Sequence, residues 1–62
     1  MTVYIYTLNE DGERKKSYRV VTCVVAIKRT DTGVILTRDC WRYMEDVVID
    51  FDGEEYELEV KF

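Results

Sequence analysis

The stretch Ser17–Arg29 reads S-Y-R-V-V-T-C-V-V-A-I-K-R and is rich in the β-branched residues that favour strands. Apolar side chains occupy both sets of alternating positions: Val21, Cys23, Val25 and Ile27 form one set, and Tyr18, Val20, Val24 and Ala26 form the other. A strand with one wet face would instead alternate between apolar and polar residues. We therefore predict a long, bent central strand whose halves serve different parts of a curled sheet, as in small barrels.

The first turn signal is Asp11-Gly12, which follows a strand predicted over Thr2–Leu8. Asp-Gly flanked by alternating apolar residues is a strong signal for a two-residue hairpin loop. Such a loop places Val3 opposite Val20, so that apolar residues of both strands share one face. It also places Tyr4 beside basic residues of the returning strand.

The last turn signal, Asp52-Gly53, predicts a second tight hairpin in which Val47 faces Leu58. Its final strand alternates apolar with charged residues: Tyr56, Leu58, Val60 and Phe62 against Glu55, Glu57, Glu59 and Lys61. This alternation is typical of a half-buried strand with one wet face. The same register places Asp50 directly opposite Glu55, and like charges in an opposed pair are destabilising.

The two cysteines, Cys23 and Cys40, flank the turn Asp31-Thr32-Gly33. A two-residue loop there places the cysteines opposite each other, where a disulfide can form, whereas a bulge at Gly33 points them to opposite faces. We favour the bulge, because Asp-Thr suits a primed two-residue turn poorly. Buried free thiols are therefore expected, with the disulfide as the alternative.

The segment 39–46 follows a strand predicted over Val34–Asp39 and has no clear period. Asp39 can cap a short helix, and the aromatic residues can equally continue the strand; we favour one helical turn. A lone Trp41 beside Arg42 and Tyr43 is expected in the core, with an interface anchor as the alternative.

These signals predict a single all-β domain over residues 1–62, with about five antiparallel strands in meander order that curl toward a small barrel. The expected core comprises Val3, Ile5, Val20, Val25, Ile27, Leu36, Val47, Ile49, Tyr56, Leu58 and Val60.

Length and composition limit the functional classes. With 62 residues, 47% hydrophobic and 35% charged, the chain has globular composition and supports one thin core. No apolar run approaches the roughly 18 residues of a membrane span, and the first residues do not read as a secretory leader. We therefore expect a protein of the cytoplasm, of its own cell or of an infected host, without membrane contact.

Charge is divided unevenly along the chain. Residues 1–42 carry eight basic and five acidic side chains, whereas residues 43–62 carry one basic and eight acidic side chains. The eight acidic residues are expected on or beside the last hairpin: Glu45, Asp46, Asp50, Asp52, Glu54, Glu55, Glu57 and Glu59. Such a ribbon can be a solvated face, or it can dock a basic protein by imitating the phosphates of nucleic acid.

A second candidate surface combines basic residues with tyrosines on the first hairpin. Its members are Tyr4, Tyr6, Arg14, Lys15, Lys16 and Arg19. Proteins that bind single-stranded nucleic acid use this combination, although the net charge of −4 makes direct nucleic-acid binding the weaker hypothesis. The basic and acidic hairpins can also attract each other, within one chain or between two copies in a homodimer.

Catalysis is not expected. The chain has no histidine, so the usual general base and the usual activator of a cysteine nucleophile are missing. Asp31-Thr32-Gly33 shares its letters with aspartic proteases but is read as a turn, because the chain is too short for that fold. Asp50-Phe51-Asp52-Gly53 lacks the spacing of a calcium loop. We predict no metal and no cofactor.

In size and charge, the chain is similar to the small inhibitors that phages deploy against the nucleic-acid machinery of their hosts, including anti-CRISPR proteins. This similarity implies an inhibitor or adaptor that presents acidic side chains to a basic partner. The alternatives are a single-strand nucleic-acid binder and a structural subunit that assembles through exposed strand edges.

Overall fold

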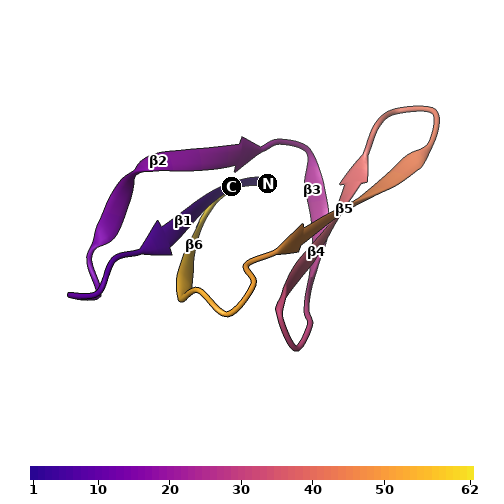
Figure 1. Cartoon of the computed structure of the whole chain (residues 1–62). Helices are drawn as coiled ribbons and strands as arrows, with labels where there is room; N and C mark the ends of the chain where they lie inside the picture. Colours follow the sequence, from indigo (N-terminus) through magenta and orange to yellow (C-terminus); the bar gives the residue numbers. More distant parts are fainter.

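The computed structural model describes residues 1–62 as six antiparallel strands in two three-stranded sheets (Figure 1). The strands are β1 (Thr2–Leu8), β2 (Arg14–Val21), β3 (Val24–Arg29), β4 (Gly33–Asp39), β5 (Met44–Asp50) and β6 (Tyr56–Lys61). One sheet has the order β2-β1-β6 and the other the order β3-β4-β5. The all-β prediction is confirmed, whereas the five-stranded meander curling into a barrel is wrong. The structure contains no helix that can cross a membrane.

The predicted central strand is divided between the two sheets. β2 ends at Val21 and β3 begins at Val24, and Cys23 between them has a left-handed backbone with φ of 59°. Val21 and Val24 are both buried, because the chain crosses from one sheet to the other and faces the same core from both sides. The expectation that the two halves serve different parts of the fold is confirmed, although they form two strands rather than one.

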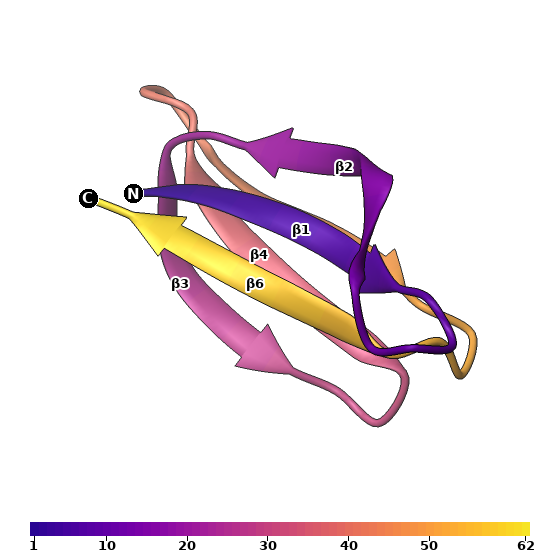
Figure 2. The ribbon, with the colours of Figure 1, turned by 90° about the vertical axis from the view of Figure 1, so that its left-hand side faces the viewer.

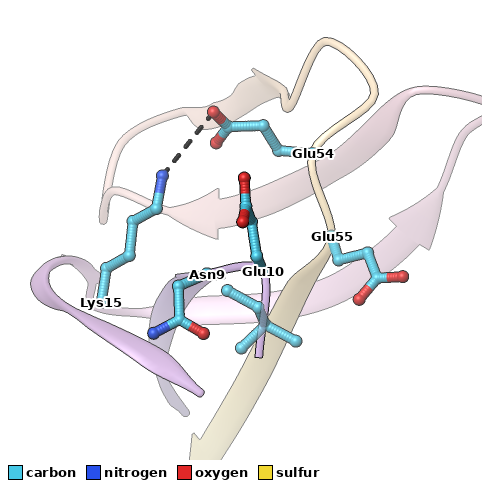
Figure 3. A pocket seen from close by; sticks show the side chains of 6 residues that line it. Asn9, Glu10, Lys15, Glu54 and Glu55 are labelled. Carbon is cyan, nitrogen blue, oxygen red and sulfur yellow. Dashed lines mark ion pairs between the residues drawn. The ribbon is translucent and has the colours of Figure 1, made fainter. Parts of the chain in front are cut away.

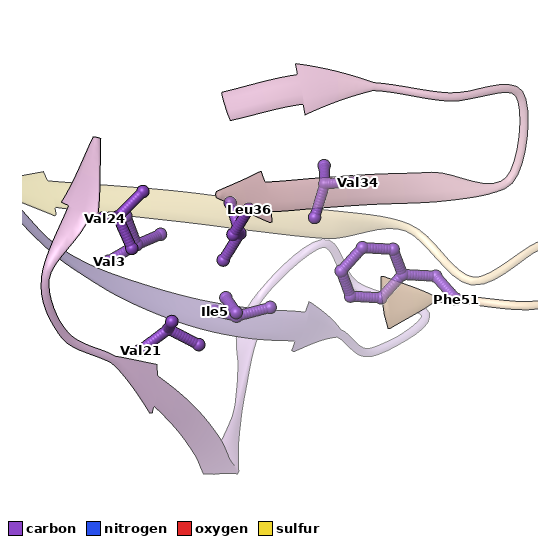
Figure 4. Packing of buried hydrophobic residues seen from close by; sticks show 7 residues of the cluster. All are labelled: Val3, Ile5, Val21, Val24, Val34, Leu36 and Phe51. Carbon is purple, nitrogen blue, oxygen red and sulfur yellow. The ribbon is translucent and has the colours of Figure 1, made fainter. Parts of the chain in front are cut away.

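The core lies between the two sheets (Figure 4). Its buried members are Val3, Ile5, Val21, Val24, Val34, Leu36 and Phe51. Six partly buried residues packed against it were expected in the core: Ile27, Val47, Ile49, Tyr56, Leu58 and Val60. The prediction is wrong for Val20 and Val25, whose side chains are 44% and 51% exposed.

The register of the first hairpin differs from the prediction by one residue. Val3 pairs with Val21 instead of Val20, and the pairing shifts between Tyr6 and Leu8. The loop is longer than two residues because the Asn9 side chain organises it, with Asn9 Oδ1 accepting hydrogen bonds from two backbone N–H groups of the turn. A shift of one residue exchanges the two faces of a strand, which explains why Val21 is buried in place of Val20.

The hairpin between β3 and β4 has the register that we did not favour. Ile27 pairs with Leu36, which leaves a two-residue loop, and the expected bulge at Gly33 is absent. Thr30 stabilises this loop, since its hydroxyl oxygen accepts a hydrogen bond from the Gly33 N–H. The irregularity lies instead between Val24 and Ala26. Both cysteines are free, but the expectation that they are buried is wrong, because Cys23 is exposed and Cys40 is only partly buried.

The expected helical turn at 39–46 is wrong, because β4 and β5 form a hairpin there. The Cys40 N–H donates to the Tyr43 carbonyl, and Trp41 has a positive φ of 75°. Asp39 caps this turn rather than a helix, since its Oδ1 accepts from the Trp41 N–H. The prediction of a core Trp41 is also wrong, because the loop directs it to solvent.

The predicted hairpin between the last two strands does not form. β5 pairs with β4, with Val47 opposite Leu36, and β6 pairs with β1, with Leu58 opposite Ile5. Consequently Asp50 lies opposite Gly33 and not opposite Glu55. The chain crosses between the sheets after β5, so that the two termini lie side by side on β1 and β6 (Figure 2).

Phe51 anchors this crossing. Its N–H donates to the Thr32 carbonyl, and its ring is buried and stacks on Tyr56 with 4.0 Å between ring centroids. An aromatic residue that must enter the core cannot occupy the loop of a tight solvent-exposed hairpin, so the chain passes over the end of the core instead.

Candidate protein-binding surfaces

The carboxylates that were expected on one acidic hairpin are distributed over three places. Glu45 and Asp46 lie near the start of β5, Asp50 to Glu55 lie at the end of β5 and in the loop after it, and Glu57 and Glu59 lie on β6. They are separated because β5 and β6 belong to different sheets.

The carboxylates of β6 are paired within the chain. Arg14 of β2 reaches across β1, donating from Nε and Nη2 to Glu57 and from Nη1 to Glu59 Oε2 at 3.0 Å. The hydrogen bond to Glu57 raises the pKa of Arg14, and the one to Glu59 adds to this effect. Lys61 lies 3.7 Å from Glu59. Exposed ion pairs contribute little stability, but they reduce the free negative charge of this face.

Tyrosines cluster on the same face, and of the basic residues that the sequence suggested, Arg14 lies with them. Tyr18 lies 6.1 Å from Tyr4 and 5.4 Å from Tyr6, measured between ring centroids. Arg14 and Lys61 cover the Tyr6 and Tyr4 rings at 4.1 and 5.3 Å. Nucleic-acid bases stack on such rings where they are open. Here the chain's own cations, themselves held by carboxylates, occupy the Tyr6 and Tyr4 rings, so these two rings do not favour nucleic-acid binding.

The remaining residues of the predicted basic surface lie elsewhere. Arg19 pairs with buried Ile5 and so lies on the opposite face of the sheet from the tyrosines, and Tyr4 pairs with Val20. Lys15 lies 3.8 Å from Glu54 (Figure 3), and Lys16 forms no ion pair.

Loops at one end of the molecule form an acidic end. The Leu8 N–H donates to the Glu55 carbonyl, which joins the β1–β2 loop to the β5–β6 loop, and Phe51 joins the latter to the β3–β4 loop. The acidic residues there are Glu10, Asp11, Glu13, Asp31, Asp50, Asp52, Glu54 and Glu55. Only Glu54 forms an ion pair, and a shallow hollow of about 550 Å³ lies beside it (Figure 3).

Sequence reasoning missed the contribution of Glu10, Asp11 and Glu13 to this acidic end. The sequence contained a signal for this contribution, because one Asp-Gly turn follows the first strand and another precedes the last strand. Their proximity depends on the pairing of β1 with β6, which brings these two turns together.

A second surface feature is the hairpin tip, which we define as Trp41–Met44 and which comprises the turn after β4 and the first residue of β5. It projects from the two sheets (Figure 1, Figure 2). Trp41, Tyr43 and Met44 are 85%, 63% and 59% exposed, and the Arg42 guanidinium lies 5.0 Å from the Trp41 ring centre. Apolar side chains of this size therefore meet water at one projecting point.

Cys40 lies at the base of the tip, and its thiol donates to Glu45 Oε2 at 3.4 Å. Partial burial raises the pKa of Cys40, and the hydrogen bond to Glu45 raises it further. Because the thiolate is the reactive form, we expect Cys23 to react with Ellman's reagent before Cys40 in the folded protein near pH 8. Mass spectrometry of the singly modified protein tests this order. Equal labelling of the two thiols would contradict it.

The structure contains no group of three or more Cys, Asp or Glu side chains that can hold a metal ion. Asp50, part of the sequence that resembled a calcium loop, accepts a hydrogen bond from the Asp52 N–H and so orders the turn.

No protein-family model, curated protein or solved structure matches the chain. Any inference about function therefore rests on the surfaces described above.

Proposed function

We propose that this protein is a non-catalytic protein-binding module, an inhibitor or adaptor, that inserts the hairpin tip into an apolar pocket of a basic protein. The exposure of Trp41 carries the proposal. Trp, Tyr and Arg are enriched among the residues that contribute most to binding, and the tip presents all three in consecutive positions.

The energetic argument concerns Trp41 and Tyr43. Aromatic side chains bury about 150–250 Å² each when they are covered, and apolar burial contributes about 25 cal/mol per Å². The two-residue turn between Cys40 and Tyr43 holds the tip in a defined backbone conformation before binding. An anchor that is already ordered loses less entropy on binding than a flexible one.

The charge of the protein supports a basic partner. The net charge is −4, and the acidic end carries carboxylates that are mostly free of ion pairs. Complementary charge accelerates association and excludes wrong partners, while the apolar anchor determines how long the complex lasts. The acidic end therefore has a steering role in this proposal, and the hairpin tip supplies the affinity.

The test uses immobilised protein and nuclease-treated cell lysate. Retained proteins are identified by mass spectrometry, purified, and titrated against the wild type and Trp41→Ala. We expect a basic partner whose affinity falls at least about 30-fold in the variant, which corresponds to the roughly 2 kcal/mol of an interface hot spot.

Phe62→Ala is the matched control, because Phe62 is a fully exposed aromatic residue that follows β6 in the other sheet. Its removal should leave the affinity unchanged. A partner that binds the Trp41→Ala variant as tightly as the wild type, or an acidic partner, would contradict the proposal.

A further inference from the structure

The sandwich is open along one side, between β2 and β5. These strands are edge strands of their sheets, so each has a row of backbone groups without a partner. Two hollows of about 280 and 210 Å³ lie between them, and both are lined by residues from β2 and from β5 or the residue after it. Arg19 of β2 lines both hollows and forms no ion pair.

The opposite side of the sandwich, between β3 and β6, is closed by hydrogen bonds. The Met1 amino group donates to the Val24 carbonyl, and the Val24 N–H donates to the Met1 carbonyl, which ties the start of β3 to the β1 sheet. Further along, Arg29 Nη1 donates to the Tyr56 hydroxyl at 2.8 Å and so links β3 to β6. An added strand is therefore accommodated more readily on the β2–β5 side.

The charges of the two open edges are opposite. β2 carries four cations and no carboxylate: Arg14, Lys15, Lys16 and Arg19. β5 carries three carboxylates and no cation: Glu45, Asp46 and Asp50. Charged edges prevent pairing with an identical edge. In this chain they disfavour β2 with β2 and β5 with β5, while they favour β2 with β5.

Exposed apolar residues occur on the same two strands. Tyr18 and Val20 belong to β2, and Val48 belongs to β5. Tyr18 is 57% and Val48 68% exposed, although both lie within strands. A strand laid along either edge would cover these side chains.

We propose that a second copy of this chain occupies the open side, with β2 of each copy pairing with β5 of the other. Figure 1 and Figure 2 show β2 and β5 running in opposite directions. A two-fold axis parallel to the strands leaves the strand directions unchanged. It places the β3-β4-β5 sheet of the second copy beside the β2-β1-β6 sheet of the first. β2 therefore meets the β5 of the second copy in antiparallel orientation. The dimer has two continuous six-stranded sheets, and it satisfies both open edges in one closed arrangement.

In this dimer, Arg19 gains carboxylates of the second copy as neighbours, and the two hollows are covered. The hairpin tip projects beyond the sheets and remains free, so the dimer presents two tips to a partner. Self-association and partner binding are therefore separate properties of the chain.

Light scattering after size-exclusion chromatography tests the dimer. At about 0.15 M salt, where only nearby charges interact strongly, the mass should approach twice the 7.4 kDa of one chain as the concentration rises. Lys16→Glu should move the midpoint of dimerisation to a concentration about tenfold higher, because a cation on each β2 becomes a carboxylate facing β5. Lys28→Glu makes the same charge change on β3 and should have no effect.

Carbodiimide coupling of a mixture of unlabelled and heavy-isotope-labelled chains identifies the edges that meet. We expect mixed-isotope crosslinks between Lys15 or Lys16 of one copy and Asp46 or Asp50 of the other. A mass that stays at that of one chain at millimolar concentration, an equal effect of Lys28→Glu, or crosslinks between other strands would overturn the proposal. Trp41→Ala should dimerise like the wild type, which separates this result from the partner-binding test.

Discussion

Replacing Leu36 with alanine is expected to lower the free energy of unfolding by about 2–5 kcal/mol. Leu36 lies in the middle of β4, is fully buried, and faces the side chains of β1 across the core (Figure 4). The surrounding strands cannot close the cavity without losing their backbone pairing. For a domain of 62 residues the total stability is roughly 3–9 kcal/mol. The variant should therefore lose a large part of its stability and unfold at a lower urea concentration than the wild type.

Far-ultraviolet circular dichroism in a urea titration measures this loss. Trp41 fluorescence is unsuitable, because the indole is exposed in the folded protein already. Val25→Ala is the control, since Val25 lies on β3 of the same sheet but is half exposed. Its loss should be below about 1 kcal/mol. A loss at Val25 equal to that at Leu36 would show that the faces of β3 are assigned incorrectly.

Replacing Gly33 with alanine is expected to lower the free energy of unfolding at least as much as Leu36→Ala does. A Cβ atom at Gly33 would lie 1.8 Å from the Ile49 carbonyl oxygen and 2.9 Å from its carbon. Both atoms belong to the backbone of β5, so relief of the overlap requires β4 and β5 to separate where Gly33 pairs with Asp50. Overpacking a core costs about 1–3 kcal/mol and occasionally more. We expect the upper end of this range or beyond, because backbone must move.

Gly12→Ala separates this steric effect from backbone strain. Gly12 has a positive φ of 79°, and no atom lies within 4 Å of the position that an alanine methyl group would take. Its substitution therefore costs only the left-handed conformation, about 1–2 kcal/mol. Urea titrations of both variants give the comparison. If Gly12→Ala proves the more destabilising, the close approach of β4 to β5 at Gly33 is not as described.

The local pattern of the sequence predicted several strands correctly. Thr2–Leu8 is β1 as expected, and the alternation of Tyr56, Leu58 and Val60 identified the side of β6 that meets the core. Alternation with period two is a property of a single strand, so it can be recognised without knowing the neighbouring strands. The choice of neighbours depends on contacts between distant residues: the predicted pairings of β1 with β2 and of β3 with β4 are confirmed, whereas the pairing predicted for the last two strands is wrong.

Two specific residues explain the main failures. Asn9 had no role in the prediction, yet its side chain organises a first loop that is longer than two residues, and the pairing then shifts again between Tyr6 and Leu8. Phe51 stands directly before Asp52-Gly53, where a tight hairpin was predicted, and an apolar ring at that place was the signal that the chain turns into the core. Both effects arise from one side chain overriding a turn motif.

The candidate surfaces were predicted in part. The sequence contained the acidic residues and indicated Trp41 as an anchor in one of two alternatives. It did not show that Arg14 pairs with Glu57 and Glu59, or that the β1–β2 loop adds carboxylates to the acidic end. These relations depend on the pairing of β1 with β6, whose residues are far apart in the sequence.

The sequence alone determined that this protein is an all-β domain, where most of its strands lie, and that Ser17–Arg29 must face a core from two sides. The tertiary structure decided that this stretch divides at Thr22 and Cys23 and that β6 joins β1 instead of β5. The physical reason is that a strand's own side chains specify which face is buried, while its backbone can pair with any free edge. The edge that it takes is selected by whichever arrangement buries Phe51 and the valines on both sides of the crossing.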